Sequence, residues 1–383
     1  MSKKMKLAIS AEDDLFQLGR ILDKRWAKKY PGASWLPLLY DYLKSDFEIV
    51  TADVALDHVT QGFWKSADMI VIQHGDDAIA HQLIEKGAFP LALTCFESPL
   101  YINDFYHKIS TIATRFKYRI LFSGLHELYN ADSGVNYHTT FPSYFLADLD
   151  MNMVSWENRK FMVAVIGNKY VIPMCCPKSY LPTEWLWWFK KIIAKFLYQS
   201  TSSGKYNTTK LQLQDYRLKL ISYFLQKNVL DLFGKGWGTL RNLPPRWQSI
   251  LKPSLTKYPA KQCENKLDTI QEYKFGLCIE NAQFPGYITE KIIDCFVAGV
   301  IPLYMGAPDI DKYIPKSCFV DLRDYNNIDE LMEYLQSMSD NDASEIITCG
   351  QQFLLSDKGR LYSYEGFAEF MASIVRAESK VIV

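Results

Sequence analysis

The sequence has no run of about eighteen uninterrupted apolar residues, the length that a transmembrane helix requires. Its first residues, MSKKMKLAIS, enter a strand-like run without the long apolar region of a secretory signal. A net charge is also absent, because 43 basic residues balance 43 acidic residues. The broad basic field of a nucleic-acid-binding protein is therefore missing, although this balance is also compatible with a local basic patch. These absences predict a folded cytoplasmic protein that does not bind nucleic acid.

Paired cysteines and zinc-binding spacings are missing too. None of the eight cysteines forms a C-x-x-C pair, and several lie in apolar runs, as Cys278 and Cys318 do. Such positions predict reduced thiols in a core, which fits a reducing compartment. The six histidines all precede residue 139 and show no spacing typical of zinc ligands. The histidines therefore predict no metal site, although one of them could line a ligand cleft.

Short apolar runs that alternate with helix-like segments indicate the fold class. The N-terminal runs cover residues 5–10, 47–52, 69–74, 90–96 and 118–124. The pattern restarts with runs at 161–167, 229–234, 273–280, 299–306 and 318–325. Alternating strands and helices predict parallel doubly wound sheets, and 383 residues are too many for one ordinary core. We predict two Rossmann-like domains facing a cleft, at residues 1–155 and 156–360, followed by a C-terminal helix or tail at 361–383.

The stretch 273–306, YKFGLCIENAQFPGYITEKIIDCFVAGVIPLYMG, combines two apolar strands with polar residues between them. Its first strand delivers Glu280 and Asn281 to the carboxyl edge of a sheet, where open α/β sheets bind ligands. A helix then begins near Thr289, and helix N-termini suit phosphate groups. Lys291 lies in that first turn, where a cation needs either an anion nearby or contact with solvent. Together these residues favour a phosphate and sugar site, with a solvated lysine as the alternative.

Two helix starts are marked by capping residues. Thr289 is expected to cap a helix over 290–298 that Gly299 ends. The segment from Asn327 to Glu330 has the form of a capping box before the apolar periodicity of LMEYLQSM.

Several motifs resemble the α-1,3/α-1,4-fucosyltransferase family. The segment YKFGLCIENAQFPGYITEKIIDCFVAGVIPLYMGAPDIDKYIPKSCFVDLRDY is similar to the donor-binding signature of that family over about fifty residues. Residues 215–238, DYRLKLISYFLQKNVLDLFGKGWG, resemble the preceding arginine-bearing helix and strand. CFESP (95–99) resembles the Glu-Ser-Pro motif of the family, and VAVIGN (163–168) is a further similarity.

The resemblance implies a GT-B fold and transfer of fucose from GDP-fucose, with inversion at the anomeric carbon and no obligatory metal or other cofactor. An inverting transfer needs a base for the acceptor hydroxyl, and Glu97 is the expected base. Arg217 and Lys291 are expected to bind the diphosphate. The residues expected to contact the rest of the donor are Asn168, Asn281, Tyr287 and Glu290. Glu280 is also a candidate donor-binding residue. Strand alternation points its side chain away from Asn281, so its role would be to brace the loop.

Other readings of the same residues stay open. Taken alone, Glu97 is also compatible with a turn glutamate held by Ser98-Pro99, and Arg217 with a solvated helix residue. Asp148 and Asp150 have the D-x-D spacing of metal-dependent glycosyltransferases, a pattern that often arises by chance. The glycines at 234, 236 and 238 hint at nucleotide binding, but a lone glycine run is a weak signal. We interpret Gly234 as a strand end and the rest as a flexible loop.

An insertion of about forty residues separates VAVIGNK from DYRL and contains WLWWFKKIIAKFLYQS. A helix over 184–199 would carry lysines on one side and aromatic residues on the other. Such a helix can lie in a membrane interface through residues 185–198, or it can pack inward. The first possibility would make the protein peripheral at the inner membrane.

The predicted activity is therefore fucose transfer to a hydroxyl of an oligosaccharide or glycolipid acceptor. An α-1,3 or α-1,4 linkage in surface polysaccharide or lipopolysaccharide is expected. The alternatives are the same fold acting on another nucleotide sugar, and a glycan- or nucleotide-binding protein without catalysis.

Overall fold

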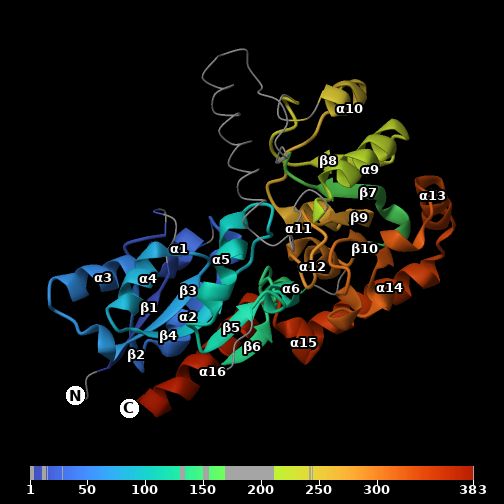
Figure 1. Ribbon diagram of the computed structural model, residues 1–383. Helices are drawn as coiled ribbons and strands as arrows, with labels where there is room; N and C mark the ends of the chain where they lie inside the picture. The colour runs from blue at the N-terminus through green and yellow to red at the C-terminus, as the bar shows by residue number, and fades with distance from the viewer. Residues whose placement is uncertain are drawn as a thin grey trace, which may run out of the picture.

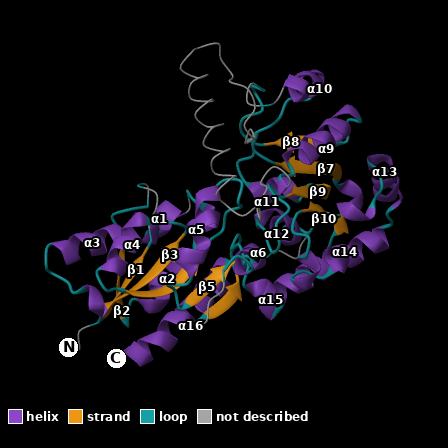
Figure 2. Cartoon of the chain, in the orientation of Figure 1, coloured by secondary structure: helices purple, strands orange, loops and turns teal. Residues whose placement is uncertain are grey.

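The computed structural model describes residues 4–10, 14, 16–27, 29–129, 134–149, 155–168, 211–240, 243 and 245–382. In this part of the chain the strands form two separate sheets, visible as two groups of arrows in Figure 2. All neighbouring strands run parallel, as the alternation of apolar runs and helices predicts. The helix expected over 184–199 lies outside the described residues.

The N-terminal sheet has the strand order β2-β1-β3-β4-β5-β6 among the described residues. Its strands are β1 (Met5–Ile9), β2 (Phe47–Thr51), β3 (Met69–His74), β4 (Phe89–Thr94), β5 (Tyr118–Leu121) and β6 (Val135–His138). The apolar runs predict the first five. They miss β6 because this edge strand, VNYH, is short and largely exposed.

Helices cover both faces of this sheet. Their bounds are α1 (Lys24–Ala27), α2 (Trp35–Leu43), α3 (Ala52–Thr60), α4 (Ala78–Glu85), α5 (Asn103–Ala113) and α6 (Ser123–His126). Side chains along β1 alternate between the two faces, so Leu7 and Ile9 pack with α2 while Ala8 packs toward α3 and α4. Both faces of β1 are therefore buried, which explains its continuous apolar run.

The last helix of the chain, α16 (Tyr364–Ile382), belongs to the core of the N-terminal domain. It runs beside α2, and its Phe367 ring lies edge-on to Trp35 with ring centroids 5.0 Å apart. Figure 1 shows this red helix returning to the blue half of the molecule. The chain thus crosses between the domains twice, and residues 361–382 form more than a tail. Within the described residues, no helix is long and apolar enough to span a bilayer.

The C-terminal sheet has the order β11-β10-β9-β7-β8 among the described residues. Its strands are β7 (Lys160–Val165), β8 (Leu230–Phe233), β9 (Tyr273–Ile279), β10 (Ile301–Met305) and β11 (Val320–Asp321). The helices are α9 (Gln214–Gln226), α10 (Pro245–Lys257), α11 (Lys266–Ile270), α12 (Glu290–Val297), α13 (Ile328–Ser337), α14 (Asp340–Leu355) and α15 (Asp357–Arg360). Since β7 and β9 are neighbours at the point where the strand order reverses, their carboxyl ends border the crevice expected to bind a ligand.

The cap predicted for α13 is present, with one change. The Asn327 side chain accepts a hydrogen bond from the Glu330 backbone N–H at 2.9 Å, as expected for a helix N-cap. The Glu330 carboxylate, however, accepts from the N–H of Asn326 at 3.0 Å, one residue earlier than a capping box requires.

Candidate active site

Glu280 lies at the carboxyl end of β9 and is fully buried, with 0% exposure. Its carboxylate accepts hydrogen bonds from the Thr289 N–H at 2.9 Å, from the Thr289 hydroxyl at 2.8 Å and from Lys291 Nζ at 2.9 Å. Glu280 therefore ties the end of the strand to the start of α12. The predicted capping of α12 by the Thr289 side chain is wrong, because the hydroxyl donates to Glu280 and makes no side-chain cap hydrogen bond.

Lys291 has the anionic neighbours that a cation in the first turn of a helix requires. Its Nζ lies 2.9 Å from Glu280 Oε2 and 3.4 Å from Glu290 Oε1, and its side chain is 14% exposed. Although burial opposes the charge of Lys291, the carboxylates of Glu280 and Glu290 raise its pKa. Lys291 is therefore a charged residue that is largely withdrawn from solvent, and the alternative of a solvated lysine is wrong.

Glu290 is flanked by a second lysine that the sequence did not reveal. Lys266 of α11 pairs with Asp294 and lies 3.9 Å from Glu290 Oε1. Burial works against ionisation of Glu290, but the charges of Lys291 and Lys266 lower its pKa to about 2. Glu290 thus stays an acceptor of hydrogen bonds at neutral pH. Asp294 lies one turn beyond Glu290, so helical spacing could have identified it, whereas no local pattern marks Lys266.

Arg217 of α9 is buried and points its guanidinium at the end of β9. One terminal nitrogen donates to the Ile279 carbonyl at 2.7 Å and to Asn281 Oδ1 at 3.0 Å. Its Nε has no hydrogen-bond partner among the described residues. The solvated alternative for Arg217 is therefore wrong. A buried guanidinium with a donor to spare is suited to an anion such as a phosphate.

Asn281 and Tyr287 connect Arg217 to the other domain. The Asn281 amide donates to the Tyr287 hydroxyl at 3.3 Å, and that hydroxyl donates to Glu97 Oε1 at 3.3 Å. Tyr287 is fully buried, so this contact lies inside the interface between the domains. A chain of hydrogen bonds therefore joins Arg217, Asn281, Tyr287 and Glu97.

Glu97 follows β4 on a short turn. Its carboxylate accepts the Ser98 N–H at 2.8 Å, and its carbonyl accepts the Tyr106 hydroxyl at 2.8 Å. Burial raises the pKa of Glu97, while the Ser98 N–H, the charge of Lys291 and the Tyr287 hydroxyl act in the opposite direction. A carboxylate more basic than usual can take a proton from a hydroxyl group more readily than an exposed one.

Tyr101 is a further residue of this cluster that sequence reasoning missed. Burial raises its pKa, and the charges of Arg217, Glu97 and Lys291 all act on it. Its hydroxyl is hydrogen-bonded to the Gln214 side chain of the other domain. In the sequence, its position four residues after Glu97 could have suggested that Tyr101 belongs to the site.

Asn168 contacts a different loop of the C-terminal domain. Its side chain donates to the Gly236 carbonyl at 3.0 Å, and its N–H donates to the Lys235 carbonyl at 2.8 Å. Trp237 Nε1 also donates to the Ile166 carbonyl at 2.7 Å. The interpretation of the segment after Gly234 as a flexible loop is wrong, because these bonds hold it as a turn against β7.

The possible D-x-D motif is described at its first position alone, since Asp150 lies outside the described residues. The Asp148 carboxylate accepts the Phe145 N–H at 2.9 Å, which closes a short turn. Where the structure is described, no group of three His, Cys, Asp or Glu side chains is placed to hold a metal ion.

The loop between Asn281 and Thr289 is held against the N-terminal domain at Gly286. The Gly286 N–H donates to Asp309 Oδ1 at 2.8 Å, and the Ser123 hydroxyl donates to Asp309 Oδ2 at 3.2 Å. Gly286 has a φ of +72°, and a Cβ there would lie 2.8 Å from the Ser123 nitrogen. Glycine is required both by the backbone and by the close approach of the two domains.

We therefore expect Gly286→Ala to lower the free energy of unfolding by about 1–3 kcal/mol, measured by denaturant titration. The matched control is Gly62→Ala, since Gly62 has a similar φ of +82° and a Cβ added to it would meet no atom within 4 Å. The control carries the backbone strain without the clash, so its loss should be smaller. Equal losses in the two variants would contradict the role of Gly286 in bringing the domains together.

Comparison with known proteins finds similarity within the C-terminal part of the chain. Residues 204–345 match the family model described as glycosyltransferase family 10 (fucosyltransferase), C-terminal part. An α-(1,3)-fucosyltransferase FucT of Helicobacter pylori is 33% identical over 105 residues, 27% of this chain and 22% of that protein. The human 4-galactosyl-N-acetylglucosaminide 3-α-L-fucosyltransferase 9 is 38% identical over 80 residues, 20% of this chain and 22% of that protein. The chain therefore spans about a fifth of the length of these relatives, and the resemblance found in the motifs is confirmed.

The fold is shared over almost the whole chain with a solved structure. The crystal structure of Anabaena Alr3699/HepE in complex with UDP and glucose aligns with a TM-score of 0.54, at 9% identity. The alignment covers 97% of this chain and 99% of that protein. Two parallel-sheet α/β domains in this arrangement constitute the GT-B fold, as predicted.

Proposed function

We propose, from a C-terminal half that carries the family 10 signature, that this chain is a glycosyltransferase that moves fucose from GDP-fucose to a hydroxyl of a glycan acceptor. The transfer inverts the anomeric carbon and needs no metal. The names of the Helicobacter pylori and human relatives support an α-1,3 linkage.

The observation that carries this proposal is the hydrogen-bonded chain from Arg217 to Glu97. It brings a candidate phosphate ligand and a candidate base, which belong to different domains, into one hydrogen-bonded cluster. A nucleotide-binding protein without catalysis would need the cationic half of this cluster, but it would have no use for a carboxylate of raised pKa beside it.

The reaction follows from the roles of these groups. The acceptor hydroxyl oxygen attacks the anomeric carbon from the face opposite to the diphosphate, and its proton passes to the Glu97 carboxylate. The bond between the anomeric carbon and the diphosphate oxygen breaks, so GDP leaves with an additional negative charge. Arg217 and Lys291 stabilise that charge. In metal-dependent transferases a divalent cation has this role. The Glu290 carboxylate accepts hydrogen bonds from hydroxyl groups of the donor, and the Asn281 side chain hydrogen-bonds to the donor as well.

Tyr287 provides a test of the base through pH. Its hydroxyl stabilises the carboxylate of Glu97, so Tyr287→Phe should raise the pKa of Glu97 further. Since a base acts in its deprotonated form, the acidic limb of the pH profile of kcat/KM should move to higher pH in the variant. The measurement is kcat/KM at a series of pH values, and superimposable profiles would argue against Glu97 as the titrating group.

The donor is tested by thermal shift with GDP-fucose and UDP-glucose, in buffer containing EDTA. We expect GDP-fucose to raise Tm by an amount that grows with its concentration, because a ligand that binds the native state stabilises it. UDP-glucose is the comparison because the protein that shares this fold was crystallised with UDP and glucose. Selective stabilisation by UDP-glucose would overturn the proposed donor, and stabilisation that requires added Mn²⁺ would overturn the metal-independent mechanism.

A further inference from the structure

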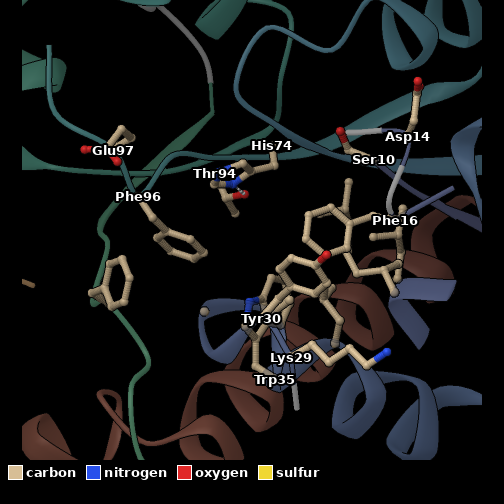
Figure 3. A pocket seen from close by; sticks show the side chains of 17 residues that line it. Ser10, Asp14, Phe16, Lys29, Tyr30, Trp35, His74, Thr94, Phe96 and Glu97 are labelled. Carbon is tan, nitrogen blue, oxygen red and sulfur yellow. Dashed lines mark hydrogen bonds between the residues drawn. The ribbon is translucent and has the colours of Figure 1, made fainter. Parts of the chain in front are cut away.

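A cavity of about 1070 Å³ lies in the N-terminal domain at the carboxyl ends of β1, β3 and β4 (Figure 3). The strand order reverses between β1 and β3, because the chain places β2 on one side of β1 and β3 on the other. Crevices at such reversal points are where open α/β sheets bind ligands. Glu97 lines the same cavity, so whatever enters the cavity lies next to the proposed base.

The walls of this cavity are largely apolar. Among the described residues, the aromatic side chains that line it are Phe16, Tyr30, Trp35, Phe96 and Phe141. Figure 3 shows the Phe96 ring beside Glu97 and directed into the cavity, and its centroid lies 5.0 Å from that of His74. Side chains of the sheet and of α2 that are buried in the core, including Ile9, Ile72 and Leu36, complete the walls.

The polar groups on the sheet side of the cavity are already engaged with the protein. The Ser10 hydroxyl donates to the Asp77 carboxylate, and His74 Nδ1 pairs with the Thr94 hydroxyl at 3.0 Å. Burial lowers the pKa of His74 to about 4, so the imidazole itself is uncharged at neutral pH. Asp14 and Lys29 also line the cavity, and both are exposed.

This distribution distinguishes between two kinds of occupant. A sugar loses hydrogen bonds to water when its hydroxyl groups are buried, and it must regain them from the protein. Among the described lining residues, the inner walls add the Tyr30 hydroxyl and Trp35 Nε1 to these engaged groups, whereas an apolar chain gains by contact with the aromatic and aliphatic surface around them. An occupant that is polar near Glu97 and apolar farther in would satisfy both ends of the cavity.

We propose that this cavity receives an apolar chain attached to the acceptor, and that the acceptor is a short glycan carried on a lipid. The inference rests on the proposed role of Glu97 as base. The acceptor hydroxyl lies at Glu97, and the first part of the lipid lies between the aromatic walls and the core residues of the sheet.

The test compares two acceptors that differ in the aglycone alone. The methyl and octyl β-glycosides of 4-galactosyl-N-acetylglucosamine, the disaccharide in the name of the human relative, are titrated into the GDP-loaded protein by calorimetry. The octyl glycoside is kept below the concentration at which it forms micelles. We expect its Kd to be lower than that of the methyl glycoside by about tenfold or more. Equal affinities, or no binding of the octyl glycoside, would overturn the proposal.

Two variants locate the binding. Gly32→Leu places a side chain in the cavity, and its Cβ would make an ordinary 3.7 Å contact with Phe141, so it should abolish the octyl preference. Tyr30→Ala removes part of the aromatic wall and should weaken the preference for the octyl glycoside. It serves as the test of the cavity if Gly32→Leu folds poorly. Lys29→Ala is the control, because Lys29 lies at the exposed mouth, and it should keep the preference. An octyl preference that persists in both cavity variants would place the apolar group elsewhere.

GDP-fucose binding by thermal shift is measured on the same proteins. It depends on the C-terminal domain, so it should be unchanged in all three variants. A wild-type protein that binds the octyl glycoside but not GDP-fucose would contradict the proposed donor while supporting the lipid chain. A protein that binds GDP-fucose without an aglycone preference would do the reverse.

Discussion

Glu97→Gln is expected to lower kcat/KM for transfer by about 10²–10⁴-fold, the range found for loss of a general base. The amide oxygen can still accept hydrogen bonds from the Ser98 N–H and the Tyr287 hydroxyl, so the turn and the domain interface should persist. The amide cannot take the proton of the acceptor hydroxyl. Transfer should therefore fail while GDP-fucose binds with nearly unchanged affinity, as measured by calorimetry.

Two further variants make this result specific. Glu97→Asp keeps a base but withdraws it from the cleft by one methylene, so it should retain part of the activity. Glu85→Gln removes an exposed carboxylate from the same domain and should leave turnover unchanged. Wild-type turnover in Glu97→Gln would remove this residue as the base, and Tyr101 would become the next titratable group to examine.

Lys291→Ala is expected to have the second large effect, on binding rather than on chemistry. A charge-assisted hydrogen bond contributes about 1.5–3 kcal/mol, so GDP and GDP-fucose should both bind about 10- to 100-fold more weakly. Equal losses for the two ligands are expected, because the lysine would contact the diphosphate that they share. Calorimetric titration of each ligand measures this effect.

The same substitution should also destabilise the fold. It leaves the Glu280 carboxylate, which has 0% exposure, without its cationic partner. Breaking a buried ion pair in this way costs about 3–5 kcal/mol. The double variant Glu280→Gln with Lys291→Ala removes the unpaired charge, so it should recover much of the stability but none of the affinity for GDP. If either folded variant bound GDP with the affinity of the wild type, Lys291 would not be a ligand of the diphosphate.

Local sequence was sufficient to bring the proposed donor-binding residues to one edge of the sheet. The strand β9, the loop after it and α12 follow one another within 25 residues, so their apolar runs and helix signals place Asn281, Glu290 and Lys291 at one sheet edge. The hydrogen-bond partners of the side chains at this edge could not be predicted from the local sequence. Thr289 does not cap α12 with its side chain, because its hydroxyl donates to the buried Glu280 carboxylate and accepts from Lys291 Nζ at 2.7 Å.

What the sequence determined by itself is the alternation that makes two parallel sheets and the set of polar residues at the ends of β4 and β9. These are local properties, because periodicity and the residues next to it encode which side chains are buried and where a strand stops. The tertiary structure decided which residues distant in the sequence become neighbours. It placed Tyr287 3.3 Å from Glu97, 190 residues away, and it brought Lys266 beside Glu290 and α16 against α2. These contacts depend on how whole elements pack, and a pattern that records burial does not record which buried side chains will meet.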